Sequence, residues 1–461
     1  MGTRSLTLET DDYGLLTDLY QLTMSACYVG EGIAETPASF ELFLRQLPDS
    51  CGYLVAAGLE QALDYLKHLK FTGEQVSALE ATGLFAGAPP QFWSLLQAGG
   101  FTGDVWAIPE GTVAFAHEPL LRIEAPLWQA QLVETYLLNT LNYQTGIATR
   151  AARMRDAAGS KTRLLEFGTR RASSPQGALW AARAALIAGF DATSNVLAAL
   201  ELGQQPSGTM AHSLVMAIAA LQGSEDEAFA AFQRYFPSAP LLIDTYDPVA
   251  AADRLAARVR AGTLHVAGVR IDSGDLVKLS QSVRERLPEA VVIASGNIDE
   301  YEIARLRAAG ACIDGYGVGT SLVTGQLCDG VYKLVEINSI STMKTSNRKE
   351  TYPGRKQIFR HYEGDRATGD RLALMEEVPQ PGERALLQRV MRRGQLLQPV
   401  EAIAAIRARS VTGIASLPPS ARKLDAPEAY PVAISTALEA LTHEVRSRPV
   451  AAGPQPATSR L

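Results

Sequence analysis

The chain has 461 residues, of which 20% are charged and 47% hydrophobic, and its formal net charge is −6. The length suggests two or three domains, and the composition is that of a globular protein rather than a disordered or fibrous one. The acidic balance argues against a general nucleic-acid binder, because such a protein needs a basic surface to meet phosphates.

The cysteines and the N-terminus favour a cytoplasmic protein. The four cysteines lie far apart without a CxxC pair, so we expect neither a disulfide framework nor a zinc site. The first residues contain no apolar segment of the signal-peptide type. The longest apolar run, Leu214 to Leu221, is too short to cross a bilayer. We therefore expect no membrane partner.

Residues 1–145 mix helical and strand-like patterns without a regular rhythm. Apolar residues at helical spacing predict helices over residues 15–28 and 58–69. The segments 40–44 and 112–123 are typical of strands. This part of the chain is expected to form an N-terminal α+β domain.

From about residue 160 to residue 340, short apolar β-runs alternate with helical stretches. The predicted strands are Arg163–Phe167, Gly189–Ala192, Ser207–Thr209, Leu241–Asp244, Val266–Ile271, Val291–Ala294, Ile313–Tyr316 and Val331–Val335. Ser174 and Asp247 each precede a proline and are expected to cap helices. Gly189 and Gly262 stand where helices should end.

This alternation predicts an α/β fold with a parallel β/α barrel. A doubly wound open sheet is the alternative, but no dinucleotide fingerprint follows the first strand. We divide the chain into the N-terminal domain (1–145), the barrel (146–340), a C-terminal segment (341–446) and a frayed tail (447–461) rich in Pro, Ala and Ser.

Polar residues at the strand ends are candidates for the active site, since a parallel barrel gathers its reactive groups there. The first cluster is Glu166 to Arg171, with sequence EFGTRR. Its arginines suit a carboxylate or phosphate, and Phe167 offers a face for a flat ring. The alternative is an interface ion pair beside a core phenylalanine.

The second cluster, Ser207 to Ser213, places His212 where a strand is expected to run into a helix. Histidine can act as a nucleophile toward phosphorus, and a helix N-terminus favours the phosphorylated product. A structural histidine with satisfied hydrogen bonds is the alternative. The nearby Asp244-Thr245-Tyr246-Asp247 also ends a strand and can add polar contacts.

The third cluster is Arg270-Ile271-Asp272-Ser273-Gly274-Asp275. Asp272 and Asp275 can hold a divalent cation or ribose hydroxyls, and Arg270 can meet a phosphate or carboxylate. Magnesium usually enters such sites together with substrate phosphates. The alternative is a capped turn with solvated acids.

The fourth cluster is a pair of Gly-rich turns, Ala294 to Asn297 and Gly315 to Thr320. Glycine lets backbone amides approach a phosphate, and barrels often bind phosphate with their late loops. Taken together, the four clusters supply groups for anions, a metal or ribose, a phosphate and a ring. This combination fits the transfer of a phosphoribosyl group, which depends chiefly on positioning and electrostatics.

The sequence resembles the nicotinate phosphoribosyltransferase family over nearly its whole length. Six segments match in order: LLTDLYQLTM from Leu15, EFGTRRA from Glu166, GTMAHS from Gly208, RIDSGDL from Arg270, SGN from Ser295 and GVGTSLVT from Gly317. The resemblance implies an irregular barrel of the type II phosphoribosyltransferases and an N-terminal domain that C-terminal residues rejoin. It also implies that a count of eight strands is one too many.

The resemblance further implies roles for individual residues. His212 is expected to be phosphorylated by ATP and to act in catalysis with Arg270 and Asp272. Substrate binding is expected at Tyr20, Phe167, Arg170, Thr209, Ser213, Gly296, Asn297, Gly319 and Thr320. From the third cluster itself, rather than from the resemblance, magnesium is expected at Asp272 and Asp275 with the substrate phosphates.

The family works as a homodimer with shared active sites, in which Tyr20 matches an aromatic that the partner subunit supplies. The expected substrates are nicotinate, phosphoribosyl diphosphate and ATP. Unlike some members, this chain has no cysteine cluster for a C-terminal zinc, and no motif lies beyond about residue 410.

Several other functions compete with this interpretation. A nicotinamide-using relative needs a buried acceptor near the ring, and Ser207 to Ser213 contains no Asp. Quinolinate should demand more basic residues, and its enzymes are shorter. A metal-dependent lyase or aldolase with a Schiff-base lysine lacks a lysine at any predicted strand end. A non-catalytic binding protein has no need of the His212 surroundings.

Overall fold

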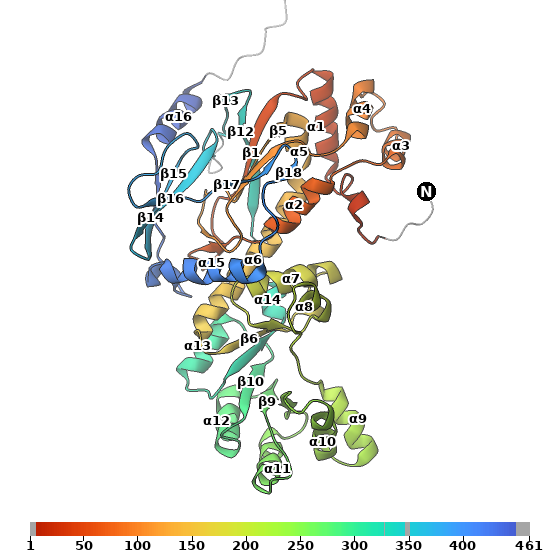
Figure 1. The fold of residues 1–461 in the computed structure, drawn as a ribbon, viewed down its shortest axis with the longest axis vertical. Coiled ribbons are helices and arrows are strands. Elements are labelled where there is room, and N and C mark those ends of the chain that lie inside the picture. The colour runs from red at the N-terminus through yellow and green to blue at the C-terminus, as the bar shows by residue number, and fades with distance from the viewer. Residues whose placement is uncertain (1–5, 327, 346–350, 449–461) are drawn as a thin grey trace, which may run out of the picture.

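The computed structural model describes residues 6–326, 328–345 and 351–448. Its strands form four sheets, of seven, six, four and two strands. The six-stranded parallel sheet and its helices occupy the lower part of Figure 1, and the other sheets lie in the upper part. Among the described helices, none combines the length and the apolar composition that crossing a bilayer requires.

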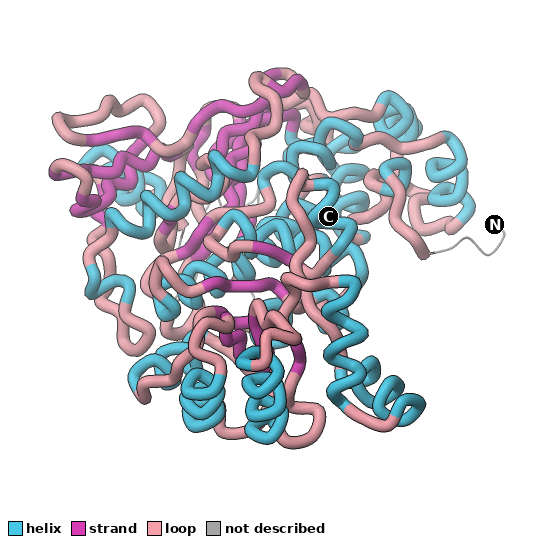
Figure 2. Tube along the Cα trace, turned by 60° about the horizontal axis from the view of Figure 1, so that its bottom comes forward, coloured by secondary structure: helices cyan, strands magenta, loops and turns pink. Residues whose placement is uncertain are grey.

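The six parallel strands form the core of an irregular β/α barrel. Their order is β7-β6-β11-β10-β9-β8. Their bounds are Arg163–Glu166 (β6), Ala192–Thr193 (β7), Leu241–Leu242 (β8), Gly268–Ile271 (β9), Val291–Ser295 (β10) and Gly315–Val318 (β11). Most of their residues are buried, as expected for parallel strands covered by helices. In Figure 2 helices (cyan) lie along the lower edge of the molecule, outside the strands (magenta) above them.

Two of the eight predicted strands are not part of this sheet. Ser207–Thr209 is not a strand: it makes one backbone hydrogen bond, from Ser207 N to Thr193 O at 2.8 Å. Pro206 lacks an N–H and Gly208 has no side chain to pack, which disfavours a ladder here. The strand predicted at 331–335 exists as β12 (Gly330–Ile337), but it pairs antiparallel with β1 (Pro37–Leu44).

The barrel helices begin and end where the local chemistry predicts. Ser174 caps α7 with its side-chain oxygen on Gly177 N, and Asp247 caps α11 in the same way. Gly189 and Gly262 follow helix ends with φ of 116° and 69°. The helices are α7 (Pro175–Ile187), α8 (Val196–Glu201), α9 (His212–Gln222), α10 (Glu225–Tyr235), α11 (Pro248–Arg260), α12 (Leu276–Arg286), α13 (Glu300–Ala308) and α14 (Thr320–Thr324).

The upper part of the molecule is built around the seven-stranded sheet β13-β12-β1-β5-β3-β17-β18. The further strands are β3 (Asp104–Ala107), β5 (Leu121–Pro126), β13 (Ile340–Ser341), β17 (Gln388–Arg392) and β18 (Gln395–Leu396), and the two-stranded sheet pairs β2 (Leu54–Val55) with β4 (Val113–Ala114). The helices are α1 (Leu19–Gly30), α2 (Leu59–His68), α3 (Gly73–Ala81), α4 (Pro90–Ala98) and α5 (Leu127–Leu132).

Two N-terminal predictions need correction. The helix predicted from residue 15 begins only at Leu19, with the extended residue Asp18 at its N-cap position. The strand predicted over residues 112–123 is broken into β4 and β5, and His117 between them has φ of 66°. That left-handed conformation is incompatible with a continuous strand.

The long helix α6 (Glu134–Ala158) connects the two parts. It packs against α2, β2 and β12 of the upper part and against α7 and α13 of the barrel. The chain therefore has no break at residue 145, because α6 continues through it.

The C-terminal residues return to the N-terminal sheet, where β17 pairs with β3. They also form β14 (Lys356–Glu363), β15 (Arg366–Leu374), β16 (Glu383–Ala385), β19 (Val432–Ile434), α15 (Ile403–Ser416) and α16 (Thr436–Ser447). Ser447 is thus helical, and the predicted tail lies outside the described residues from residue 449 onward.

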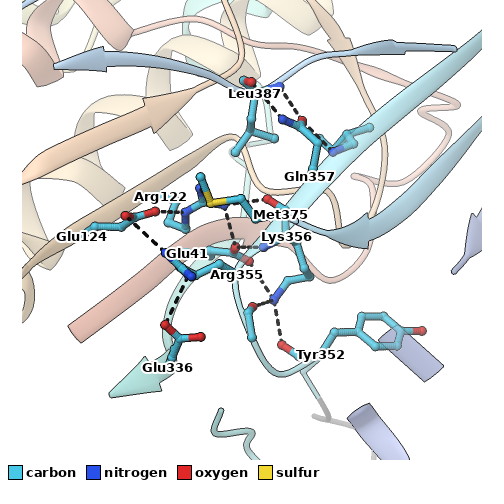
Figure 3. Close-up of polar contacts among 12 residues, drawn as sticks. Glu41, Arg122, Glu124, Glu336, Tyr352, Arg355, Lys356, Gln357, Met375 and Leu387 are labelled. Carbon is cyan, nitrogen blue, oxygen red and sulfur yellow. Dashed lines mark hydrogen bonds and ion pairs between the residues drawn. The ribbon is translucent and has the colours of Figure 1, made fainter. Parts of the chain in front are cut away.

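A buried ionic cluster attaches this C-terminal segment to the N-terminal sheet (Figure 3). The ammonium group of Lys356 lies 2.8 Å from the Glu41 carboxylate, and Arg122 donates to the Lys356 carbonyl at 2.6 Å. Lys356 and Arg122 are at most 2% exposed and Glu41 is fully buried. Because buried charges are stable only when paired, this cluster fixes β14 against β1 and β5.

Candidate active site

The strand ends of the barrel surround a cavity of about 720 Å³. Ten of the predicted site residues line it: Phe167, Arg170, Thr209, His212, Arg270, Asp272, Gly296, Asn297, Gly319 and Thr320. These residues are separated by up to about 150 positions in the chain, and the parallel sheet brings them to one mouth. The volume is within the range of small-molecule sites.

The loop after β6 supplies the aromatic and two of the arginines. The Phe167 N–H donates to Val318 O at 2.7 Å, which fixes the loop against the neighbouring strand β11. Arg170 and Arg171 lie on a 3₁₀ turn at Thr169–Arg171, and both line the cavity. Guanidinium groups beside an aromatic face can bind a planar anion.

His212 is the first residue of α9, and the preceding Ala211 is the N-cap. Its Nδ1 atom lies 3.1 Å from the hydroxyl oxygen of Thr245, just after β8. The imidazole therefore stands at a helix N-terminus, where negative charge is favoured.

The end of β9 places a cation between two acids. Burial lowers the pKa of Arg270. The nearby carboxylates of Asp272 and Asp244 oppose this shift, whereas the positive charge of Arg170 adds to it. Among the described residues, Nε of Arg270 has no hydrogen-bond partner. A half-buried guanidinium with an open donor is suited to an anionic ligand.

Asp272 is held rigidly at the cavity wall. Asp244 accepts the Asp272 N–H at 2.8 Å and the Ser273 hydroxyl at 2.7 Å. The Ser295 hydroxyl donates to the Asp272 carboxylate. These bonds leave part of that carboxylate for a ribose hydroxyl or a cation.

At two positions of the Gly-rich turns only glycine fits, because a neighbouring segment lies too close for a side chain. A Cβ on Gly296, which has φ of 84°, would lie 2.0 Å from the carbonyl oxygen of Asp272. A Cβ on Gly317 would lie 2.4 Å from the Phe167 ring. Asn297 also has positive φ, at 52°. The two turns are therefore packed tightly against the other site segments.

Three predicted site residues do not line this cavity. Tyr20 lies on α1 in the upper part of the molecule, where its hydroxyl contacts Glu134 at 3.3 Å. Ser213 is exposed on α9. Asp275 is exposed, caps α12 through Lys278 N and pairs with Lys278 Nζ at 3.0 Å.

The position of Asp275 does not agree with the prediction that it shares a metal with Asp272. Its carboxylate serves the helix cap, which is the alternative considered from the sequence. Within the described residues, no group of three or more His, Cys, Asp or Glu could hold a metal ion. The described cysteines are all free.

The sequence reasoning missed Ser194 and Val196, which line the cavity after β7. The signal was present, because polar residues Thr193 to Asn195 follow a predicted strand, as in the other clusters. Only two residues of β7 are strand, so its end was hard to locate. Among the described residues, the cavity is lined by no lysine, which disfavours a Schiff-base enzyme.

The fold and the cavity define a class of protein: a β/α barrel whose strand ends form a cavity lined by three arginines and suited to an anionic ligand. Three family profiles match the chain: the nicotinate phosphoribosyltransferase (NAPRTase) N-terminal domain at residues 15–142, the NAPRTase family at 162–309 and the C-terminal domain at 384–442. The chain belongs to the nicotinate phosphoribosyltransferase family.

Curated relatives agree along most of the chain. The nicotinate phosphoribosyltransferase pncB2 of Mycobacterium tuberculosis is 40% identical, with 91% of each chain covered. The Bacillus subtilis enzyme is 42% identical over 80% of this chain and 77% of its own, and the human enzyme is 34% identical over 94% and 96%.

Solved structures share the fold. The crystal structure of human nicotinic acid phosphoribosyltransferase superposes with a TM-score of 0.80 at 31% identity, covering 94% of this chain and 100% of that one. A Pyrococcus furiosus nicotinate-nucleotide pyrophosphorylase has a TM-score of 0.73 at 23% identity, over 90% and 98%, which supports the fold alone.

Proposed function

We propose that this enzyme transfers the phosphoribosyl group of phosphoribosyl diphosphate to nicotinate, giving nicotinate mononucleotide and pyrophosphate for NAD synthesis. The observation that supports this most is the convergence of Phe167, three arginines and the glycine turns on one cavity. Relatives at 40% and 42% identity have the same named activity.

The charges of the cavity favour an acid over a neutral amide. Asp272 is the one acidic residue among the described lining residues, against Arg170, Arg171 and Arg270. A carboxylate needs donors and positive charge, whereas an amide also needs an acceptor. Nicotinate is therefore the expected base, stacked on Phe167.

The chemistry requires little acid or base catalysis. As the anomeric bond of the diphosphorylated ribose breaks, positive charge develops on the sugar and negative charge on the departing pyrophosphate. Asp272 can steady the sugar, while Arg270 and the backbone amides of the Gly296 and Gly319 turns can hold anionic oxygens. The protein thus acts by positioning and by fixed charges.

ATP is proposed as a co-substrate that phosphorylates His212. His212 lies at the N-terminus of α9 and its Nδ1 contacts the Thr245 hydroxyl, and both features suit a histidine nucleophile. Magnesium is proposed to enter with the substrate phosphates, next to Asp272. When bound, it would neutralise phosphate charge.

A homodimer with shared active sites is proposed because Tyr20 is far from its own cavity yet nearly half exposed, at 47%. Exposed apolar side chains on α8 and α9, including Val196 at 58% and Met216 at 55%, offer a surface for a second copy.

We also propose a cytoplasmic location, since free cysteines fit a reducing compartment.

Product analysis tests the main proposal. Purified enzyme is incubated with nicotinate, phosphoribosyl diphosphate, magnesium and ATP, and nicotinate mononucleotide is quantified against a nicotinamide reaction. Preference for nicotinamide would reject the proposed substrate.

Radiolabel from the γ-phosphate of ATP tests the proposed phosphohistidine. We expect acid-labile label on His212, absent in His212→Ala, and uncoupling of ATP hydrolysis in that variant. Label on another residue, or none, would contradict it.

Subunit mixing tests the shared site. Tyr20→Ala and His212→Ala chains, each lacking ATP-coupled transfer alone, should regain it when co-refolded, because mixed dimers hold one intact site. No recovery in dimers shown to be mixed would contradict the arrangement.

A further inference from the structure

Glu166 is not among the residues that line the cavity, although its neighbour Phe167 is. Glu166 is the last residue of β6 and is 1% exposed. Among the described residues it forms no salt bridge, and burial raises the pKa of its carboxyl. Burying a carboxyl group without a neighbouring cation costs free energy, so we ask what the hydrogen bonds of Glu166 do for the site.

Each oxygen of Glu166 holds a different segment of the site. One accepts the backbone N–H of Gly168, and the other accepts the Thr193 hydroxyl at the end of β7. The Glu166 carbonyl also accepts the Ser194 N–H at 2.9 Å. One residue therefore joins the loops that follow two neighbouring strands.

On the β6 side, Gly168 starts the turn of the two arginines. Its carbonyl accepts the Arg171 N–H at 2.7 Å, so a shift of Gly168 displaces the whole turn. A Cβ at Gly168 would lie 2.4 Å from Val323 and 2.8 Å from Glu166, so the turn is closely enclosed.

On the β7 side, the Thr193 hydroxyl links Glu166 to the start of α8. Its oxygen accepts the Asn195 N–H at 2.9 Å, and the Asn195 side chain caps α8 at Ala198 N, 3.0 Å away. The segment between them carries Ser194 and Val196 in the cavity wall.

We propose that Glu166, with Thr193, is a positioning residue that holds the base-binding side of the cavity in place, namely Phe167, Arg170 and Arg171 opposite Ser194 and Val196. This inference rests on the proposed function. Among the described residues, the Glu166 carboxylate and the Thr193 hydroxyl form no hydrogen bond with the segments of His212, Asp272 and Thr320. Those segments are joined to this side through backbone bonds, such as Ser207 N–H to Thr193 O, which a side-chain substitution leaves in place.

Substitutions at both residues test the proposal. Glu166→Gln leaves one acceptor for two donors, and Thr193→Val removes the hydroxyl while keeping the shape. In each we expect KM for nicotinate to rise about tenfold, as for one lost buried hydrogen bond, while KM for phosphoribosyl diphosphate stays within about twofold. Thr193→Ser, which keeps the hydroxyl, should restore KM for nicotinate.

Thr140→Val is the matched control. Thr140 is fully buried, and among the described residues its hydroxyl has no hydrogen-bond partner. If Glu166→Gln does not fold, the Thr193 pair alone decides the question. An equal rise of both KM values, or no rise, overturns the inference. A wild-type enzyme that fails to convert nicotinate instead overturns the proposed function, so the two failures are distinguishable.

Discussion

The Nδ1 atom of His212 and the hydroxyl oxygen of Thr245 lie 3.1 Å apart, although the two residues belong to different β/α units. His212 begins α9 and Thr245 follows β8. Because one ring nitrogen is engaged, the other is left for chemistry. The threonine hydroxyl can donate or accept, so it fits either tautomer of the ring.

Thr245→Val should therefore weaken the histidine chemistry. With the ring no longer oriented, we expect kcat for the ATP-coupled reaction to fall roughly tenfold, equivalent to one hydrogen bond lost in the transition state. Phosphohistidine formation should fall in parallel, measured by acid-labile label. Thr263→Val, which removes an exposed hydroxyl bonded to Arg258 O, serves as the control.

Gly317→Ala should disturb the aromatic platform. The new Cβ would lie 2.4 Å from the Phe167 ring, so the ring must move at a cost of about 1–3 kcal/mol. We expect a higher KM for nicotinate in steady-state kinetics. Gly73→Ala, where a Cβ meets nothing within 4 Å, should behave as wild type. An unchanged KM in Gly317→Ala would show that the ring does not bind the base.

Substitutions of Asp272 and Asp275 should have different effects on the magnesium dependence of the reaction. Asp272→Asn is expected to lower activity and to raise the magnesium concentration for half-maximal rate, because Asp272 lines the cavity. Asp275→Asn should leave that concentration unchanged, since its carboxylate caps α12 and pairs with Lys278. A comparable effect of both substitutions would show that Asp275 also binds the metal.

Glu118 should make stability depend on pH. Burial, followed by the neighbouring Asp370, raises the pKa of Glu118 well above its usual value of 4.5. The folded chain then keeps a proton that the unfolded chain releases, so the free energy of unfolding falls as pH rises from about 4.5 through the raised pKa.

Denaturant unfolding at several pH values measures this effect. Glu118→Gln should flatten the decline by up to about 1.4 kcal/mol per pH unit within that window. Glu363→Gln, at an exposed position, should leave the decline as it is. Parallel curves for wild type and Glu118→Gln would contradict the assignment.

Lys356→Met should destabilise the fold by about 3 kcal/mol, because the fully buried Glu41 carboxylate loses its ammonium partner at 2.8 Å. It keeps the backbone N–H of residue 356 at 2.9 Å and the Arg122 contact at 3.7 Å. Chemical denaturation checks this value. Adding Glu41→Gln should recover part of the loss. Lys423→Met, at an exposed pair with Glu428, is the control and should change little.

Much of the barrel and its site could be predicted from sequence, because local rules govern those features. The caps at Ser174 and Asp247 depend on side chains within three residues of the helix start. Parallel strands place all their carboxyl ends at one edge, so polar residues after β6, β9, β10 and β11 converge whatever the strand order.

The tertiary structure decided what depends on distant partners. β12 reads as one more barrel strand, yet Tyr332 stacks on Phe40 at 5.0 Å and the strand pairs with β1, almost 300 residues earlier. Asp272 and Asp275 look equivalent in sequence, but one side chain lines the cavity and the other caps a helix. The periodicity of a strand does not name its neighbour, and a residue type does not fix where its side chain points; long-range packing settles both.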